Sequence, residues 1–373
     1  MNKTRLKEID ILRATAFIFV VAQHTMGGFS NIEGINFFDY TILKFLYVMA
    51  KTAVPIFLFI SGLSLFYVHS DKFDWKKYYI KRLKYIFIPY IIWSAINMVK
   101  LGNTDRFKDF IVQVIAGNGG YHLWYMGMVM RVYLIFPIIL FIAKKVHLMG
   151  TKVRKAVFIG LVILYYLISK YQNIVADNIS FFMFGNPSEI QHRIVNISIL
   201  FWFLYFVLGI YFALNYSYFK KKVLEYKGII LIGYFLLFIY AYLNEVNIIG
   251  FVRVLSLLYS VFSILTFYIM CVFLSDKNRI YNIMNFIGKY SFVAYMAHII
   301  VINYVVNEIR LNLCTKDYLV LGVLAWITTA IITPILFSII SYIPYSEYLT
   351  GVKNKKSILN IRNLIKNEYK ESV

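Results

Sequence analysis

Cysteine, charged side chains and the signature motifs of soluble enzymes are scarce or absent in this sequence of 373 residues. The two cysteines, Cys271 and Cys314, both fall in or beside apolar stretches, so they form neither a disulfide framework nor a thiolate metal site. The sequence contains no P-loop, no GxGxxG after a strand, no HExxH and no nucleophile elbow. Charged residues make up only 15% of the chain, which excludes a water-soluble fold of ordinary composition.

Apolar residues are abundant instead. Hydrophobic residues account for 60% of the chain and the mean hydropathy is +0.67, so we expect a bilayer as the solvent. The net charge of +21 would suggest a nucleic-acid partner in a soluble protein. Here it indicates cytoplasmic loops facing anionic membrane lipid, and we expect no nucleic-acid partner. The richness in Ile, Lys, Asn and Tyr is typical of AT-rich bacterial genomes, and we expect the protein in a bacterial plasma membrane.

The predicted fold class is all-α, a polytopic transmembrane bundle of about ten helices. Candidate spans cover residues 9–29, 42–67, 84–101, 121–143, 155–172, 195–214, 227–243, 250–274, 286–308 and 318–343. The loops on the side of the N-terminus carry 27 Lys and Arg, whereas the opposite loops carry seven. By the positive-inside rule, this asymmetry predicts that both termini are cytoplasmic. We therefore expect a transmembrane domain over residues 1–345 and a basic cytoplasmic tail over residues 346–373.

Two ionisable side chains interrupt the first span, which has no cleavage signature and is therefore not expected to be a signal peptide. Arg13 and His24 are 11 residues apart. They therefore lie about 20° from perfect alignment and about 16 Å apart along one face of a helix. Burying such groups in a bilayer is costly, which makes both of them functional candidates. The alternatives are snorkelling to the inner headgroups for Arg13, where Asp10 can pair with it, and an interhelical hydrogen bond for His24.

Later spans carry further polar candidates for contacts with a substrate. Lys51 precedes Pro55 by four residues, and this proline is predicted to kink the span or to start a half-helix. The following pair, Ser61 and Gly62, permits close helix packing. The remaining candidates are His122 and Trp124 at the start of the fourth span, Arg131 within it, and His298 in the ninth. Each has an alternative role in packing or interfacial anchoring, since Trp is a common interfacial anchor.

Six motifs resemble those of the acyltransferase type 3 family and occur in the family order over about residues 8–300. The first, EIDILRATAFIFVVAQH, runs from Glu8 to His24. The others are VPIFLFISG (54–62), KRLKYIFIPY (81–90), HLWYM (122–126), FVLGIYF (206–212) and IGKYSFVAYMAH (287–298). Within the family, the chain looks most similar to bacterial proteins that modify surface polysaccharides, including those associated with intercellular-adhesin export.

The resemblance implies that the protein transfers an acyl group, commonly acetyl from acetyl-CoA, to a hydroxyl of a lipid-linked or exported carbohydrate. The Arg and the His of the family motif correspond to Arg13 and His24. The predicted catalytic residues are therefore His24 and Arg13, and we expect His24 to act as the general base on the sugar hydroxyl or, as the alternative, to become acylated itself. We expect no metal cofactor.

The basic segment between Lys76 and Lys84 is the densest candidate for contacts with the phosphates of CoA, although ordinary positive-inside charge explains it equally well. Family members often carry two arginines three residues apart before the third span. Here Arg82 is followed by Tyr85, with Lys81 and Lys84 beside it. We expect Arg13 and this cluster to hold the cofactor. The expected donors to the thioester oxyanion are Ser61, His122, Trp124 and Arg131.

Two other functions fit the same residues. An exporter of polysaccharide or of a small solute could use the intramembrane basic residues as substrate contacts, without any acyl transfer. A sensor or scaffold of an envelope complex is the third alternative, and the lack of a recognisable soluble domain disfavours it. The acyl group, the acceptor glycan and the oligomeric state are not specified by the sequence.

Overall fold

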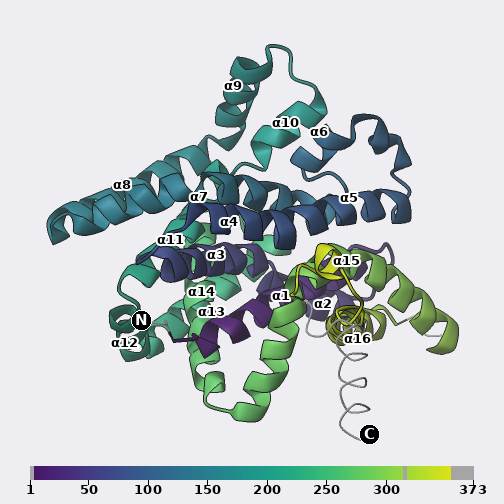
Figure 1. Cartoon of the computed structure of the whole chain (residues 1–373). Coiled ribbons are helices and arrows are strands. Elements are labelled where there is room, and N and C mark those ends of the chain that lie inside the picture. Colours follow the sequence, from purple (N-terminus) through teal and green to yellow (C-terminus); the bar gives the residue numbers. More distant parts are fainter. Residues whose placement is uncertain (1–3, 314–316, 354–373) are drawn as a thin grey trace, which may run out of the picture.

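The structure is a computed structural model that describes residues 4–313 and 317–353. Every regular element in these ranges is a helix, which confirms the predicted all-α fold (Figure 1). The first part of the chain forms α1 (Lys7–Phe29), α2 (Phe37–Ala50), α3 (Ala53–His69), α4 (Trp75–Arg82), η1 (Leu83–Phe87), α5 (Ile88–Lys100), η2 (Thr104–Asp109), α6 (Phe110–Ile115), η3 (Tyr121–Leu123) and α7 (Trp124–Leu148). The second part forms α8 (Thr151–Lys170), α9 (Gln172–Phe184), α10 (Glu189–Asn196), η4 (Ile199–Phe201), α11 (Phe203–Leu214), α12 (Tyr216–Glu225), α13 (Lys227–Glu245), α14 (Arg253–Ser275), α15 (Asn278–Leu313), α16 (Tyr318–Ile340) and α17 (Glu347–Thr350).

Seven segments of the described chain are long and apolar enough to cross a membrane. They are Lys7–Phe29, Phe37–His69, Tyr121–Leu148, Lys227–Glu245, Arg253–Ser275, Asn278–Asn312 and Tyr318–Ile340. Each overlaps one of the predicted spans. The protein is therefore a membrane protein with several membrane-length helices.

The other three predicted spans are not among these seven segments. Residues 84–101 form the π-helical η1 and the 13-residue α5. Residues 155–172 correspond to α8, which begins with several basic residues, and residues 195–214 end in α11, which has only 12 residues. The count of ten and the cytoplasmic placement of both termini remain predictions.

Helix α1 lies at the centre of the bundle and packs against α2, α3, α14, α15 and α16. Most of its apolar residues are buried, including Phe17, which is fully enclosed. Gly288 of α15 lets that helix approach the α1 backbone, because a Cβ there would lie 2.8 Å from the carbonyl oxygen of Asp10. The helix that carries both candidate catalytic residues is thus enclosed by protein on most sides.

The second membrane segment is broken into α2 and α3, as the proline predicted. Lys51 and Thr52 interrupt the helix, and the hydroxyl of Thr52 donates to the carbonyl of Met49 at 3.0 Å. Pro55 falls in the first turn of α3, where a missing N–H leaves no hydrogen bond unmade. The break therefore allows α3 to begin inside the segment with a full set of satisfied backbone groups.

Helices α3 and α11 approach each other through two glycines. A Cβ on Gly62 would lie 2.1 Å from the carbonyl oxygen of Phe206, and one on Gly209 would lie 2.1 Å from that of Phe59. Only hydrogen fits at either position, so the close packing predicted for Ser61–Gly62 is confirmed.

The chain after α16 turns back against the bundle. The indole of Trp93 on α5 donates to the carbonyl of Leu349 at 2.9 Å, and Lys84 pairs with Glu347 at 3.0 Å. Gly351 adopts φ +65° and packs against the backbone of Tyr85. The first residues of the predicted tail, up to residue 353, are therefore packed against η1 and α5, and the rest of the tail lies outside the described residues.

Candidate active site

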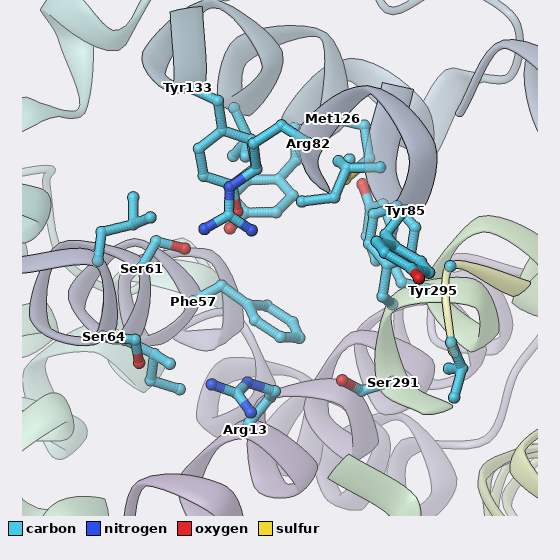
Figure 2. A pocket seen from close by; sticks show the side chains of 18 of the residues that line it. Arg13, Phe57, Ser61, Ser64, Arg82, Tyr85, Met126, Tyr133, Ser291 and Tyr295 are labelled. Atoms are coloured by element: carbon cyan, nitrogen blue, oxygen red, sulfur yellow. The ribbon is translucent and has the colours of Figure 1, made fainter. Parts of the chain in front are cut away.

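An internal cavity of about 370 Å³ lies between α1, α3, α7 and α15. Its Lys and Arg lining residues are Arg13 from α1, Arg82 from the end of α4, and Lys289 from α15. Figure 2 shows the two guanidinium groups directed into the cavity from opposite sides, with Phe57 between them. Within the described chain, no Asp or Glu lines this cavity. The cavity therefore suits an anionic ligand.

Arg13 faces this cavity and a second one beside it. The second cavity, of about 500 Å³, shares Arg13, Ser64 and Val68 with the first and extends toward the start of α1. The predicted pairing with Asp10 is confirmed at 3.5 Å, but Asp10 lies closer to Arg5, at 2.6 Å. Because Asp10 also pairs with Arg5, it neutralises the charge of Arg13 only in part, and Arg13 can attract an anionic ligand in the cavity.

Arg82 is held by aromatic rings and not by a carboxylate. Its guanidinium carbon lies 5.1 Å from the ring centroid of Tyr78 and 4.8 Å from that of Tyr133. Its Nε is buried without a hydrogen-bond partner. The π-helical turn η1 follows directly, and such turns often occur at functional sites. The side chain is thus oriented while its hydrogen-bonding capacity is only partly used.

The two lysines predicted to act with Arg82 lie elsewhere. Lys81 is exposed, and Lys84 pairs with Glu347. Burial alone would raise the pKa of Glu347, but hydrogen bonds from its own backbone and from Lys84 lower that pKa below its usual value. Neither lysine is among the residues that line the internal cavity.

Three aromatic rings, here called the aromatic wall, line one part of the internal cavity. The ring centroid of Phe57 lies 5.8 Å from that of Tyr125 and 6.4 Å from that of Tyr295, and the two tyrosine rings are 5.7 Å apart. The Tyr295 hydroxyl donates a hydrogen bond to the backbone carbonyl of His122. The wall therefore connects the cavity directly to the element that carries His122.

Three histidines meet behind this wall. His298 lies between the other two, with its ring centroid 5.1 Å from that of His24 and 4.9 Å from that of His122. The rings of His24 and His122 are 6.4 Å apart. His122 and His298 are almost completely buried, at 1% and 0% exposure. The structure thus brings together three candidates that the sequence placed on three different spans.

Backbone carbonyls specify the tautomers of the two buried rings. Nδ1 of His298 contacts the carbonyl of Tyr295, and Nε2 of His122 lies 3.2 Å from the carbonyl of Met296. A carbonyl only accepts, so each of these nitrogens carries the hydrogen in the neutral ring. The other nitrogens, Nε2 of His298 and Nδ1 of His122, are therefore acceptors, and both are buried without a partner.

His24 is partly buried and lines an outer cavity of about 460 Å³. Tyr121 contributes a second aromatic ring, 5.5 Å from that of His24. The polar residues Asn303, Asn307 and Arg310 of α15 line the same cavity. Arg13 and His24 therefore face separate cavities near opposite ends of α1.

The other predicted substrate contacts do not join the histidine cluster. Lys51 pairs with Glu245 at 2.7 Å, and the ring of Trp124 packs 5.2 Å from that of Trp202. Arg131 donates to the carbonyls of Gly127 in its own helix, Ile194 in α10 and Ile115 at the end of α6, and so connects these three helices. Ser61 lines the internal cavity.

Sequence reasoning missed Tyr295, Tyr121 and Asn97. The amide of Asn97 donates to the carbonyl of Met296 at 3.0 Å, next to the contact made by His122. Tyr121 directly precedes His122, and Tyr295 lies three residues before His298 within the motif at 287–298; these are the signals that distinguish them among 32 tyrosines. Within the described residues, no group of three or more His, Cys, Asp or Glu is arranged to hold a metal ion.

Comparisons with known proteins add one finding. The family model described as an acyltransferase domain matches residues 6–343, which is nearly the whole chain. The matched region contains all six sequence motifs. No curated protein and no solved structure gives a significant match.

Proposed function

The chain belongs to the acyltransferase type 3 family, and we propose that it moves an acyl group, acetyl in the simplest case, from acyl-CoA to a hydroxyl of a cell-surface or lipid-linked polysaccharide. The observation that carries the proposal is that α1 presents Arg13 to one cavity and His24 to another. The donor occupies the internal cavity and the acceptor the outer one. The protein acts in a bacterial plasma membrane.

The internal cavity suits the donor because its lining combines basic residues with the rings of the aromatic wall. Arg13 and Arg82 bind the phosphates of CoA, since guanidinium groups make strong charge-assisted hydrogen bonds to phosphate oxygens. The pantetheine arm then extends toward the aromatic wall. The offset between Arg13 and His24, about 16 Å along the helix, is suited to this extended arm.

His24 is the general base in the proposed reaction. It takes the proton of the acceptor hydroxyl as the hydroxyl oxygen attacks the thioester carbonyl, forming the C–O bond. The C–S bond of the tetrahedral intermediate then breaks. The proton passes from His24 to the departing CoA sulfur, so the products are the acyl ester and free CoA thiol. No oxidant or further reactant is needed.

His298 orients His24 for this role. The Nε2 of His298 is an acceptor without a partner, and His122 cannot donate to it because the only N–H of the neutral His122 ring is directed at Met296. The neighbouring imidazole that remains is His24. If one nitrogen of His24 donates its N–H to His298, the other nitrogen has a free lone pair. That lone pair can take the proton of the carbohydrate hydroxyl that receives the acyl group.

The aromatic wall separates donor from base and must open during transfer. Phe57, Tyr125 and Tyr295 line the internal cavity, and the ring of Tyr295 also packs against those of His122 and His298, with centroids 6.0 and 5.5 Å apart. Side-chain rotation of one of these rings admits the acyl group. The size of that opening limits the acyl chains that the enzyme accepts.

The proposal is tested with membranes that contain the protein and with radiolabelled acetyl-CoA. Alkali-labile label is expected to appear in an envelope polymer, and His24→Ala is expected to abolish it while leaving the amount of folded protein unchanged. His192→Ala is the matched control, because His192 lies on α10 beside Asp177. Normal labelling by the His24 variant would overturn the mechanism.

An exporter is the second candidate function, because two cavities separated by a closed wall also fit a transport path. The two functions differ in their need for acyl-CoA. Export that continues when acyl-CoA is absent, together with no label transfer, would favour the exporter.

A further inference from the structure

Helix α8 leans away from the rest of the bundle (Figure 1). Only Tyr165 and Ser169, near its end, are buried. Tyr165 donates to the carbonyl of Phe201 at 3.0 Å, and Ser169 accepts from Arg253 at 2.9 Å. The first half of the helix has no buried residue. This half therefore stands apart from α7 and leaves a groove between them.

The groove is a cavity of about 300 Å³ between α7, α8 and α11. Its lining is apolar, with Ile139, Ala143, Phe158 and Tyr211 among its residues, except at the end where His147 and Arg154 lie. The rings of Phe158 and Tyr211 stack at 4.6 Å. Along α7 the groove runs from Ile139 to His147, about 12 Å of helix.

Arg154 lies at the polar end of the groove. Its guanidinium contacts Nδ1 of His147 at 3.3 Å and donates to the hydroxyl of Thr151 at 3.1 Å. Neither contact is with a carboxylate. The sequence contains no Asp or Glu from residue 110 to residue 176, and no carboxylate of the described chain lines the groove. The guanidinium is oriented, but its charge is uncompensated.

We propose that this groove binds one anionic phospholipid of the surrounding bilayer. An acyl chain lies along the groove, and the phosphate contacts Arg154. A guanidinium whose contacts include no carboxylate makes strong hydrogen bonds to phosphate oxygens. Lys144 and Lys145 in the last turns of α7 add positive charge near this end of the groove.

The occupant comes from the bilayer because the flanks of the groove are exposed and apolar. Phe141 is 59% exposed, Ile159 57% and Ile163 55%, and all three belong to helices α7 and α8. Such a surface faces lipid chains in a membrane protein. This site is lined by none of the residues of the internal or outer cavity, so the proposal is independent of the acyltransferase mechanism.

The test is a titration of purified full-length protein with phosphatidylglycerol or phosphatidylcholine of identical acyl chains. Retained lipid is counted by native mass spectrometry, and the thermal midpoint is measured in parallel. Phosphatidylglycerol is expected to bind more tightly and to raise the midpoint further. Arg154→Gln is expected to weaken phosphatidylglycerol binding about fivefold, the effect of one basic residue at an anionic surface.

Lys152→Gln is the matched control, because it removes one positive charge two residues away without lining the groove. This variant is expected to bind lipid as the wild type does. Ala143→Phe, which fills the groove, is expected to lower binding of both lipids and provides an independent test should Arg154→Gln fail to fold. Two results would overturn the proposal: equal binding of the two lipids by the wild type, or equal losses of phosphatidylglycerol binding in the Arg154 and Lys152 variants. Either result would mean that lipid binds this surface only unspecifically.

Discussion

The imidazoles of His24 on α1 and His298 on α15 lie with ring centroids 5.1 Å apart, and the unpartnered Nε2 of the fully buried His298 is an acceptor. Two substitutions distinguish whether His298 orients His24 or only packs in the core. His298→Asn keeps a donor for the Tyr295 carbonyl but removes the Nε2 acceptor, whereas His298→Gln places an amide oxygen near the Nε2 position. We expect the Asn variant to lose about 100-fold in kcat, toward the lower end of what general-base catalysis contributes.

The Gln variant is expected to recover part of that loss, while both variants keep the thermal midpoint of the wild type and an unchanged KM for acyl-CoA. Rates are measured over a pH series. In the Asn variant, the limb of the pH–rate profile that reports ionisation of the catalytic base is expected to shift. Full activity of the Asn variant would exclude an orienting role. So would losses of activity that match losses of thermal stability in both variants.

Arg13 and Arg82 are expected to affect donor binding. Arg82→Gln removes a charged donor from the internal cavity, and hydrogen bonds to charged groups are worth about 1.5–3 kcal/mol. The KM for acetyl-CoA should rise about 10- to 100-fold, with a smaller change for acceptor. Lys81→Gln, an exposed neighbour outside the cavity, serves as the control. A KM that is the same for both variants would remove Arg82 from the donor site.

The aromatic wall is expected to determine which acyl chains are accepted. Phe57→Leu opens space beside Tyr125 and Tyr295, and each added methylene in such a pocket is worth about 1–3 kcal/mol. The ratio of butyryl to acetyl transfer should rise about tenfold or more. Competition between the two acyl-CoA donors measures this ratio. An unchanged ratio would mean that the acyl group does not pass this wall.

The contact between α3 and α11 predicts a large difference among glycine substitutions. A Cβ at Gly62 would lie 2.1 Å from a backbone oxygen, whereas one at Gly160 on α8 meets nothing within 4 Å. Gly62→Ala should cost about 1–3 kcal/mol or more, as overpacking does. Gly160→Ala should leave the thermal midpoint unchanged or raise it, because Ala favours helix. Similar midpoints for the two variants would show that α3 and α11 separate readily.

Glu347 links the segment after α16 to η1. Its lowered pKa means that the ionised form is favoured in the folded protein. The ionised Glu347 therefore contributes to folding stability at neutral pH, and this stability is lost as pH falls through that pKa. Glu347→Gln should therefore flatten the acidic limb of the stability–pH profile. It should also make residues near 347–353 more accessible to protease. A profile identical to that of the wild type would show that the pair with Lys84 contributes nothing.

Local features of the chain could be predicted from the sequence because they depend on short-range geometry. Helical periodicity alone places Arg13 and His24 on one face, and the early proline of α3 explains the break after Ala50. Composition alone indicates a membrane protein, because so much apolar surface has no other stable solvent. Close helix packing at Gly62 could also be predicted, because glycine has no side chain to keep a neighbouring helix away.

The partners of these features depend on which helices pack together, and this is a property of the whole bundle. No local pattern indicates that His298 would contact His24 while Trp124 would pack on Trp202. Arg131 and Lys84 were predicted to contact ligands, as Arg82 was, yet Arg131 donates to helix carbonyls and Lys84 pairs with a carboxylate. Long polar side chains reach several neighbours, so their roles follow from the backbone groups and charges that distant segments bring within hydrogen-bonding distance.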